Sequence, residues 1–228
     1  MELTYDGLRI ARTFFTFKNA STYDQIVRFT TFGQDYHWKT QIIRILRKQQ
    51  MSVLDLACGT GILSFMLIDK RPSIRVIGLD LIWEYLQVAK SKKSDSLLVN
   101  GNAEILPFID ESFDCVMSSY LPKYVNIDIL TEECCRVLKH GGSVIFHDFT
   151  YPRNLMVQNL WKAYFAILRF MAKFVKSWNI VFFQLDKIII ANNWLEDILQ
   201  SLEKKGFMDI SYKHYTLGTA AIISARKP

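Results

Sequence analysis

The 228-residue chain lacks the features that mark several classes of protein. It contains only 4 cysteines, 5 prolines and 10 glycines, which argues against a disulfide-rich framework and against a low-complexity chain. Charges interrupt every apolar stretch before about 18 residues, so no membrane span is evident. The first residues also lack the basic start and apolar run of a signal peptide. We therefore expect a cytoplasmic protein with reduced thiols.

The composition that remains is that of a folded enzyme-sized domain. Half of the residues are hydrophobic and 14% are aromatic, which excludes a disordered chain. The length fits a single domain over residues 1–228. The formal net charge is +6, but the basic residues form no stripe typical of a nucleic-acid groove, so we expect no nucleic-acid partner. The cysteines form no C-x-x-C pair, and we expect no metal site.

The most informative segment is residues 53–61, Val-Leu-Asp-Leu-Ala-Cys-Gly-Thr-Gly. It predicts a buried strand that ends in a glycine turn, with a helix beyond it. Asp55 before the turn can accept hydrogen bonds from an amine, which suits an α-amino acid carrying a sulfonium better than a pyrophosphate. We therefore predict S-adenosylmethionine as the cofactor. The loop predicted to bind it comprises Asp55, Ala57, Cys58, Gly59, Thr60 and Gly61.

A dinucleotide site is the alternative interpretation of this turn. Residues 59–64 are one residue from the G-x-G-x-x-G/A pattern, with Ser64 at the third small position. A glycine turn that binds nothing is also open. Asp55 and the pair Ala57-Cys58 before the first glycine favour S-adenosylmethionine.

Polar residues follow three further predicted strands. Asp80, followed by Leu81, lies 21 residues beyond Gly59, where a carboxylate can accept both ribose hydroxyls of either nucleotide. Residues Asn102, Ala103 and Glu104 follow the next strand, where an amide can recognise the adenine edge. Ser119 ends the strand after that and can contact the methionine portion.

Apolar strands alternate with helical segments along most of the chain. This pattern predicts a parallel sheet wound on both faces, a seven-stranded Rossmann-like α/β fold with an antiparallel hairpin at its end. The predicted strands are 53–56, 74–79, 96–100, 113–118, 143–147, 208–215 and 220–225. The predicted helices are 38–49, 62–68, 82–90, 127–139, stopped by glycines 141 and 142, and 194–205. Residues 1–37 are expected to be an irregular cap over the site.

Residues 150–192 form a predicted helical insertion outside this alternation. Within it, residues 155–176 form an amphipathic helix whose four cations, Lys162, Arg169, Lys173 and Lys176, lie on one face. One interpretation is a helix packed on the sheet with a solvated basic side. The other is a substrate cap whose apolar side meets a greasy ligand while its cations approach lipid headgroups, which would be a peripheral membrane contact.

Together these segments resemble the class I methyltransferases. Residues 102–108, 110–114 and 136–142 look like the ubiquinone/menaquinone-biosynthesis C-methyltransferases. So do residues 23–24, 32–35 and 38–39, and the final 218–228. The resemblance implies cofactor contacts at Thr60, Asp80, Asn102, Ala103 and Ser119. The chain departs from that family at residues 120–125, where Lys123 stands at an arginine position.

The resemblance implies methylation of a small hydrophobic acceptor. An aromatic carbon becomes nucleophilic when a ring hydroxyl loses its proton, so a nearby cation or base assists. We expect Lys123 to stabilise the phenolate and Tyr23 to position the ring, with His147 and Asp148 as a further candidate base.

Three functions stay open from the sequence. The first is C-methylation of a prenylated quinol or phenol. The second is O- or N-methylation of another small molecule or lipid, and the third is cofactor binding without catalysis. A monomer or a homodimer fits each of them.

Overall fold

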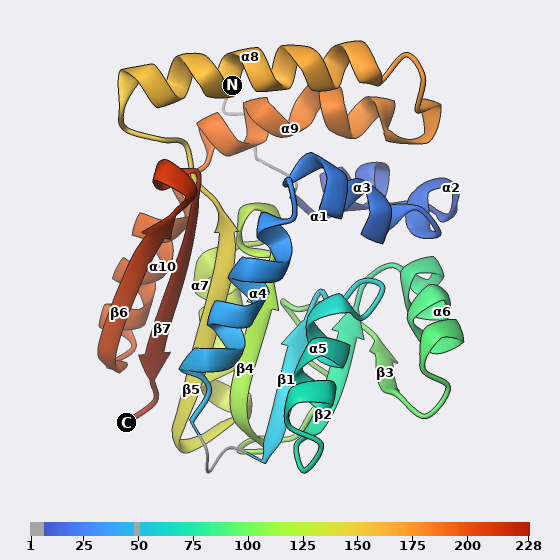
Figure 1. Ribbon diagram of the computed structural model, residues 1–228. Coiled ribbons are helices and arrows are strands. Elements are labelled where there is room, and N and C mark those ends of the chain that lie inside the picture. The colour runs from blue at the N-terminus through green and yellow to red at the C-terminus, as the bar shows by residue number, and fades with distance from the viewer. Residues whose placement is uncertain (1–6, 48–50) are drawn as a thin grey trace.

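Seven strands form one sheet in the order β3-β2-β1-β4-β5-β7-β6 (Figure 1). The computed structural model describes residues 7–47 and 51–228. The strands are β1 (Ser52–Leu56), β2 (Arg75–Asp80), β3 (Leu97–Asn100), β4 (Phe113–Ser119), β5 (Leu138–Phe149), β6 (Met208–Tyr215) and β7 (Ala220–Arg226). The strands β1 to β5 all run parallel to one another, and β7 pairs antiparallel with β5 and β6. The predicted fold class and the terminal hairpin are confirmed.

The centre of the sheet is apolar on both faces. Val53, Leu54 and Leu56 of β1 are fully buried, as expected of a strand that lies between two parallel neighbours. The chain goes from β1 outward to β2 and β3, then returns to β4 on the other side of β1. The order therefore reverses between β1 and β4, and ligands of such sheets bind beyond the carboxyl ends of the strands at this point.

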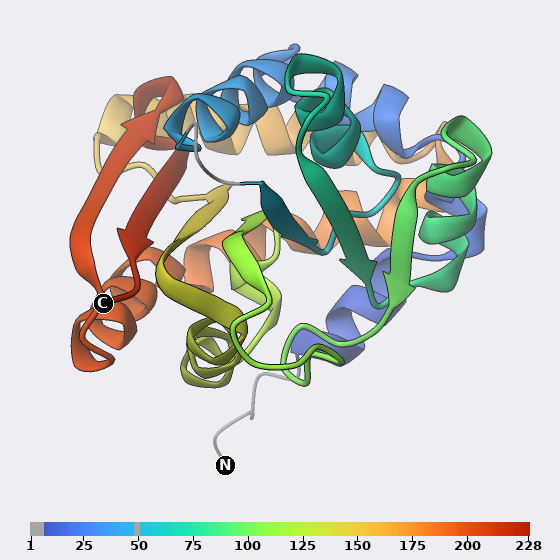
Figure 2. The same cartoon turned by 90° about the horizontal axis from the view of Figure 1, so that it is seen from below.

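Helices cover both faces of the sheet (Figure 2). They are α4 (Gln34–Ile45), α5 (Ile62–Lys70), α6 (Trp83–Lys92), α7 (Ile127–Val137) and α10 (Trp194–Lys204). One buried cluster joins α4 and α5 to one face, and a second joins α7 and α10 to the other. Because each helix buries an apolar stripe against alternate residues of the strands, the two clusters make the two halves of the core.

The expectation of an irregular N-terminal segment was wrong. Within the described residues this segment forms three short helices, α1 (Gly7–Phe14), α2 (Phe17–Ala20) and α3 (Tyr23–Thr30), and α4 begins at Gln34. Helices of four to eight residues are unstable alone and show no long periodicity in the sequence. Their aromatic residues pack on the helical insertion, which stabilises them. Residues 1–6 of the predicted cap, and the last residues of the predicted helix 38–49, lie outside the described residues.

The boundary between α7 and β5 also differs from the prediction. The helix ends at Val137 and β5 begins at once with Leu138, which pairs with Phe113 of β4. The register shifts before Ser143 pairs with Cys115, so Gly141 (φ 72°) and Gly142 lie in an irregular part of the strand. The glycines therefore belong to β5 and do not terminate the helix.

The helical insertion forms a layer above the carboxyl ends of the strands (Figure 1). It contains two antiparallel helices, α8 (Leu155–Met171) and α9 (Asn179–Ala191), where the sequence predicted one helix to residue 176. The side chain of Asn154 caps α8 by accepting hydrogen bonds from two backbone amides. A third apolar cluster joins this layer to α1 and α3. The insertion and the N-terminal helices therefore form one cover over the ligand edge of the sheet.

Candidate functional site

The glycine turn that the sequence predicts after β1 is present, and both of its glycines have a left-handed backbone. Gly59 has φ 56° and Gly61 has φ 84°, and Gly61 is the residue before α5. Asp55 is 1% exposed, and the Ser64 hydroxyl of α5 donates to its Oδ2 at 2.6 Å. Burial raises the pKa of Asp55 to about 7. Asp55 lies on β1, at the point where the strand order reverses. Because its pKa is raised, its carboxyl group changes charge near neutral pH.

Asp80 joins the glycine turn to the end of β2. The Gly59 amide donates to its Oδ2 at 2.7 Å, and the Ile82 amide donates to its Oδ1 at 2.8 Å. Burial raises the pKa of Asp80 to about 6, although both amide hydrogen bonds oppose that rise. Each oxygen keeps a lone pair that can accept a further hydrogen bond. The carboxylate can thus hold the turn and a ligand at the same time.

A crevice runs along the carboxyl ends of β1, β2 and β4. Its wall combines a few polar groups with apolar and aromatic side chains, which suits a nucleoside. It brings together most of the residues that the sequence singled out. These are Tyr23, Ala57, Gly59, Asp80, Leu81, Asn102, Ala103 and Ser119.

A smaller cavity continues from the crevice toward α4 and contains two opposite charges. It is lined by Asp55, Cys58 and Lys39, together with Tyr23 and Ser119. Lys39 is buried and pairs with Asp35 one turn earlier on α4. The sequence did not predict a role for Lys39. It appeared there only in residues 38–39, one of the segments that resemble the C-methyltransferase family. Its burial beside Asp55, which the sequence does not show, makes it a candidate site residue.

Three predicted contacts do not line the crevice through their side chains. The Thr60 hydroxyl donates to Asp24 of α3 at 2.5 Å and therefore points toward the cover. Gly61 has no side chain and is the N-cap residue of α5. Glu104 accepts a hydrogen bond from the Asn126 amide at 2.6 Å and lines a different hollow.

Cys58 packs behind the glycine turn. A β-carbon on Gly78 would lie 2.7 Å from the Cys58 sulfur, so the pair requires glycine on β2. Burial raises the pKa of this thiol well above its usual value, which makes it unreactive. All four cysteines are free in the structure.

A second, larger cavity lies between the sheet and the cover. It has a volume of about 320 Å³, and its wall is mostly apolar. The residues that line it come from α3, α8 and α9 and include Ile26, Trp161, Phe165, Phe182 and Leu185. It meets the crevice at four aromatic residues, which line both: Phe15, Tyr23, Tyr120 and Tyr124. A long hydrophobic molecule bound in this cavity would have one end beside the crevice.

The polar groups in the wall of this cavity are tied to buried acids. Lys123 donates to Asp148 Oδ1 at 2.6 Å and to the Tyr120 carbonyl at 2.9 Å. Burial lowers the pKa of Lys123 against the opposing effect of Asp148. The Tyr120 hydroxyl donates to Asp35 Oδ1 at 2.8 Å. Lys123 therefore forms a neutral pair, and Tyr120 connects both cavities to the Asp35–Lys39 pair.

His147 lies behind the wall. Its Nδ1 is 2.9 Å from the Ser119 hydroxyl, and its Nε2 is buried without a hydrogen-bond partner among the described residues. Burial lowers its pKa well below the usual value, so the ring is neutral. Its ring centroid is 5.0 Å from that of Tyr120. The residue supports Ser119 and Tyr120 and lines neither cavity.

Comparison with known sequences gives a consistent result. A family model described as the ubiE/COQ5 methyltransferase family matches residues 9–227. A demethylmenaquinone methyltransferase of Paenarthrobacter aurescens (strain TC1) is 32% identical over 216 residues, which cover 92% of this chain and 83% of that protein. A demethylmenaquinone methyltransferase of Anoxybacillus flavithermus (strain DSM 21510 / WK1) is 29% identical over 224 residues, which cover 92% of this chain and 93% of that protein.

Solved structures share the fold at low sequence identity. Geranyl diphosphate C-methyltransferase from Streptomyces coelicolor A3(2), solved with S-adenosyl-L-homocysteine, has a TM-score of 0.61 and 12% identity, covering 85% of this chain and 79% of that chain. Phosphoethanolamine N-methyltransferase 2 of Haemonchus contortus, in complex with S-adenosyl-L-methionine, has a TM-score of 0.66 and 17% identity, covering 99% and 60%. These likenesses support the fold alone.

The raised pKa of Asp55 predicts a pH dependence of stability. An unfolded aspartate has a pKa near 3.9, so between about pH 4 and pH 7 the native state binds more protons than the unfolded state. The free energy of unfolding therefore falls as the pH rises through this window. Asparagine does not titrate, so Asp55→Asn removes this contribution. Between pH 4 and pH 8 we expect the free energy of unfolding of the variant to fall by about 1–4 kcal/mol less than that of the wild type. Urea unfolding at each pH measures the difference.

The matched control for this experiment is Asp95→Asn. Asp95 is exposed in the turn before β3, and its replacement should leave the pH dependence unchanged. Parallel pH curves for the wild type and Asp55→Asn would contradict the assignment of a raised pKa to Asp55.

Proposed function

This chain belongs to the ubiE/COQ5 methyltransferase family and uses S-adenosylmethionine, and we propose that it methylates a ring carbon of a prenylated quinol. The observation that carries the proposal is the apolar cavity of about 320 Å³, which joins the cofactor crevice at an aromatic junction. The names of the relatives agree with it, since the proteins of P. aurescens and A. flavithermus are demethylmenaquinone methyltransferases. A prenylated naphthoquinol is accordingly the acceptor that we favour.

The residues of the crevice fit the cofactor by charge and shape. S-adenosylmethionine carries an α-ammonium and an α-carboxylate, and the small cavity offers one group for each, Asp55 and Lys39. Asp80 keeps acceptor capacity for ribose hydroxyls. The apolar surfaces of Leu81 and Ala103 suit the adenine ring. In this assignment Asn102 and Ser119 make the remaining polar contacts.

Bound S-adenosylmethionine supplies an activated methyl group. The chain has to hold the acceptor carbon in line with it and exclude water, and such orientation can supply roughly 7–11 kcal/mol of the barrier in favourable cases. Tyr23 lines both cavities and the small one, so we assign it the positioning of the acceptor ring. We assign the exclusion of water to the cover of α1, α3, α8 and α9.

The acceptor hydroxyl must also lose a proton. The Tyr120 hydroxyl stands at the junction of the cavities and donates to Asp35. We assign to Tyr120 the transfer of this proton, taking it from the acceptor while passing its own to Asp35. Lys123 is neutralised by Asp148, so we assign it a weaker electrostatic effect on the phenolate and the positioning of the Tyr120 backbone.

A labelled-methyl transfer assay tests the function. With methyl-labelled S-adenosylmethionine and a detergent-solubilised prenylated naphthoquinol, we expect label in the quinone that survives acid and base treatment, because a carbon–carbon bond holds it. Label lost as methanol, or found on oxygen or nitrogen, would instead support the second function open from the sequence. A boiled enzyme is the control for chemical transfer.

Filling the cavity should separate acceptor binding from cofactor binding. Leu185→Trp places a larger side chain in the wall of the apolar cavity. We expect the KM of the prenylated acceptor to rise about tenfold or more, equal to at least about 1.4 kcal/mol of lost binding, with an unchanged Kd for S-adenosylmethionine. Steady-state kinetics and calorimetric titration measure the two. Gln184→Trp, exposed on the same helix, is the control and should change neither.

Removing the Tyr120 hydroxyl should slow the proton transfer. For Tyr120→Phe we expect kcat to fall by about 10²–10⁴, the usual contribution of a positioned acid or base. The loss should shrink as the pH rises, because the acceptor then ionises without help. A kcat–pH profile measures this effect. Tyr164→Phe is the control, since the Tyr164 hydroxyl in the same cavity donates only to the Thr30 carbonyl. An equal loss at every pH would count against proton transfer by Tyr120.

A further inference from the structure

The outward side of α8 carries an apolar stripe that is exposed among the residues that the structure describes. Its residues are spaced four, three, four, three and four apart, which places them on one side of a helix. They are Met156, Leu160, Ala163, Ile167, Phe170 and Phe174, the last in the turn after the helix. The five large side chains are between 59% and 75% exposed. Exposed apolar patches of this kind mark an interaction site.

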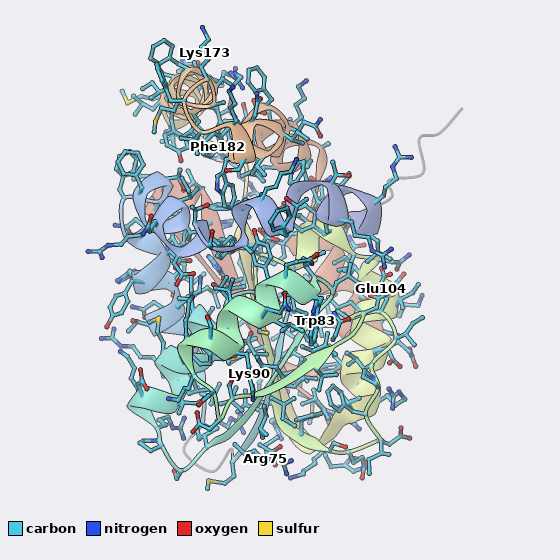
Figure 3. All side chains as sticks on the ribbon, turned by 90° about the vertical axis from the view of Figure 1, so that its right-hand side faces the viewer. Arg75, Trp83, Lys90, Glu104, Lys173 and Phe182 are labelled. Atoms are coloured by element: carbon cyan, nitrogen blue, oxygen red, sulfur yellow. The ribbon has the colours of Figure 1, made fainter. Side chains whose placement is uncertain are left out.

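The opposite side of the same helix accounts for its packing. Trp161, Phe165 and Leu168 are buried in the cluster that holds the cover together. In Figure 1, α8 is the outermost element, with α9 between it and the N-terminal helices. In Figure 3, Lys173 lies at the outer extremity of the molecule, and Phe182 lies deeper, toward the body. The stripe is therefore additional to what the fold requires.

The charge around the stripe is strongly positive. Residues 155–191 contain five cations and a single anion, a net charge of +4 out of +6 for the whole chain. The anion, Asp186, already pairs with Arg169 at 2.6 Å. Lys162 and Lys173 have no carboxylate partner among the described residues, and the Lys173 ammonium is 5.4 Å from the centroid of the Phe170 ring. An apolar stripe flanked by lysines is typical of helices that lie on anionic lipid.

We propose that the outer side of α8 docks on an anionic lipid bilayer, from which the acceptor cavity is filled. Leu160 belongs to the stripe and also lines that cavity. Phe32 and Leu217 line it as well, although they are 79% and 76% exposed. The docking surface is thus continuous with the mouth of the cavity. The supply of acceptor rests on the proposed function, but the docking itself does not.

A bilayer suits this surface better than a second copy of the chain. Two copies packed through α8 would bring the same lysines together without carboxylates to neutralise them, which is unfavourable. No helix among residues 7–47 and 51–228 is long and apolar enough to cross a membrane. A helix with one apolar and one basic face lies in the plane of the bilayer surface, so the proposal puts the stripe among the headgroups and upper acyl chains.

Vesicle flotation of the full-length protein tests the proposal. We expect binding to vesicles of phosphatidylcholine with phosphatidylglycerol, and much weaker binding to phosphatidylcholine alone. The double variant Ile167→Glu, Phe170→Glu should reduce binding about tenfold or more, since it removes apolar contact and adds repulsion. Each of Lys162→Glu and Lys173→Glu should weaken it about fivefold or more, and high salt should have a similar effect. Ile109→Glu, at a loop residue that is 81% exposed, is the matched control and should bind as the wild type does.

The outcomes separate the docking surface from the enzyme's chemistry. Activity on detergent-solubilised acceptor should be unchanged in the α8 double variant, because neither residue lines a cavity. Wild-type protein that fails to bind either vesicle, or a double variant that binds as well as the wild type, overturns the proposal. A dimer in sedimentation that the double variant abolishes, without vesicle binding, assigns the stripe to a second copy. Vesicle binding by a protein inactive on every quinol would refute the proposed function and leave the docking surface intact.

Discussion

The site depends on the carboxylate of Asp80 and the two backbone amides that donate to it. Gly59 reaches it from the turn after β1, and Ile82 from the residues after β2. These hydrogen bonds hold the turn against the neighbouring strand, so the crevice has its shape before a ligand arrives. A carboxylate buried in this way is costly unless its oxygens are satisfied, and the two amides supply that compensation. The same oxygens retain the capacity to accept hydrogen bonds from sugar hydroxyls, so one carboxylate can serve the fold and a ligand.

The division of the molecule into sheet and cover separates two tasks. The sheet carries the polar groups of the cofactor crevice at its carboxyl edge, while α8, α9 and the N-terminal helices build the apolar cavity above it. The two meet at an aromatic junction, where the Tyr120 hydroxyl donates to the buried Asp35. The polar wall that can hold a cofactor and the apolar wall that can hold an acceptor therefore come from different parts of the fold.

Several site residues were predictable because their roles are local. Asp55, Gly59 and Asp80 occupy fixed positions relative to a strand and its turn, and the parallel sheet brings those positions to one edge. Lys39 was not predictable in this way. It comes from α4, before the first strand, and only the packing of that helix on the sheet carries its ammonium into the cavity of Asp55. Lys123 and Asp148 were each singled out, but their contact was not foreseen, since residues 25 apart have no spacing that reveals contact.

The sequence by itself determined the sheet, the glycine turn and the cofactor, because alternating apolar segments and turn residues act over a few positions. It also determined the amphipathic character of the insertion. Only the tertiary structure decided that most of residues 7–30 are helical, that Glu104 and Thr60 turn away from the crevice, and which side of α8 is exposed. These features arise from contacts between segments far apart in the chain. Beside its basic face, α8 has two apolar faces, the buried one and the exposed stripe. Periodicity cannot tell which of the two will be covered.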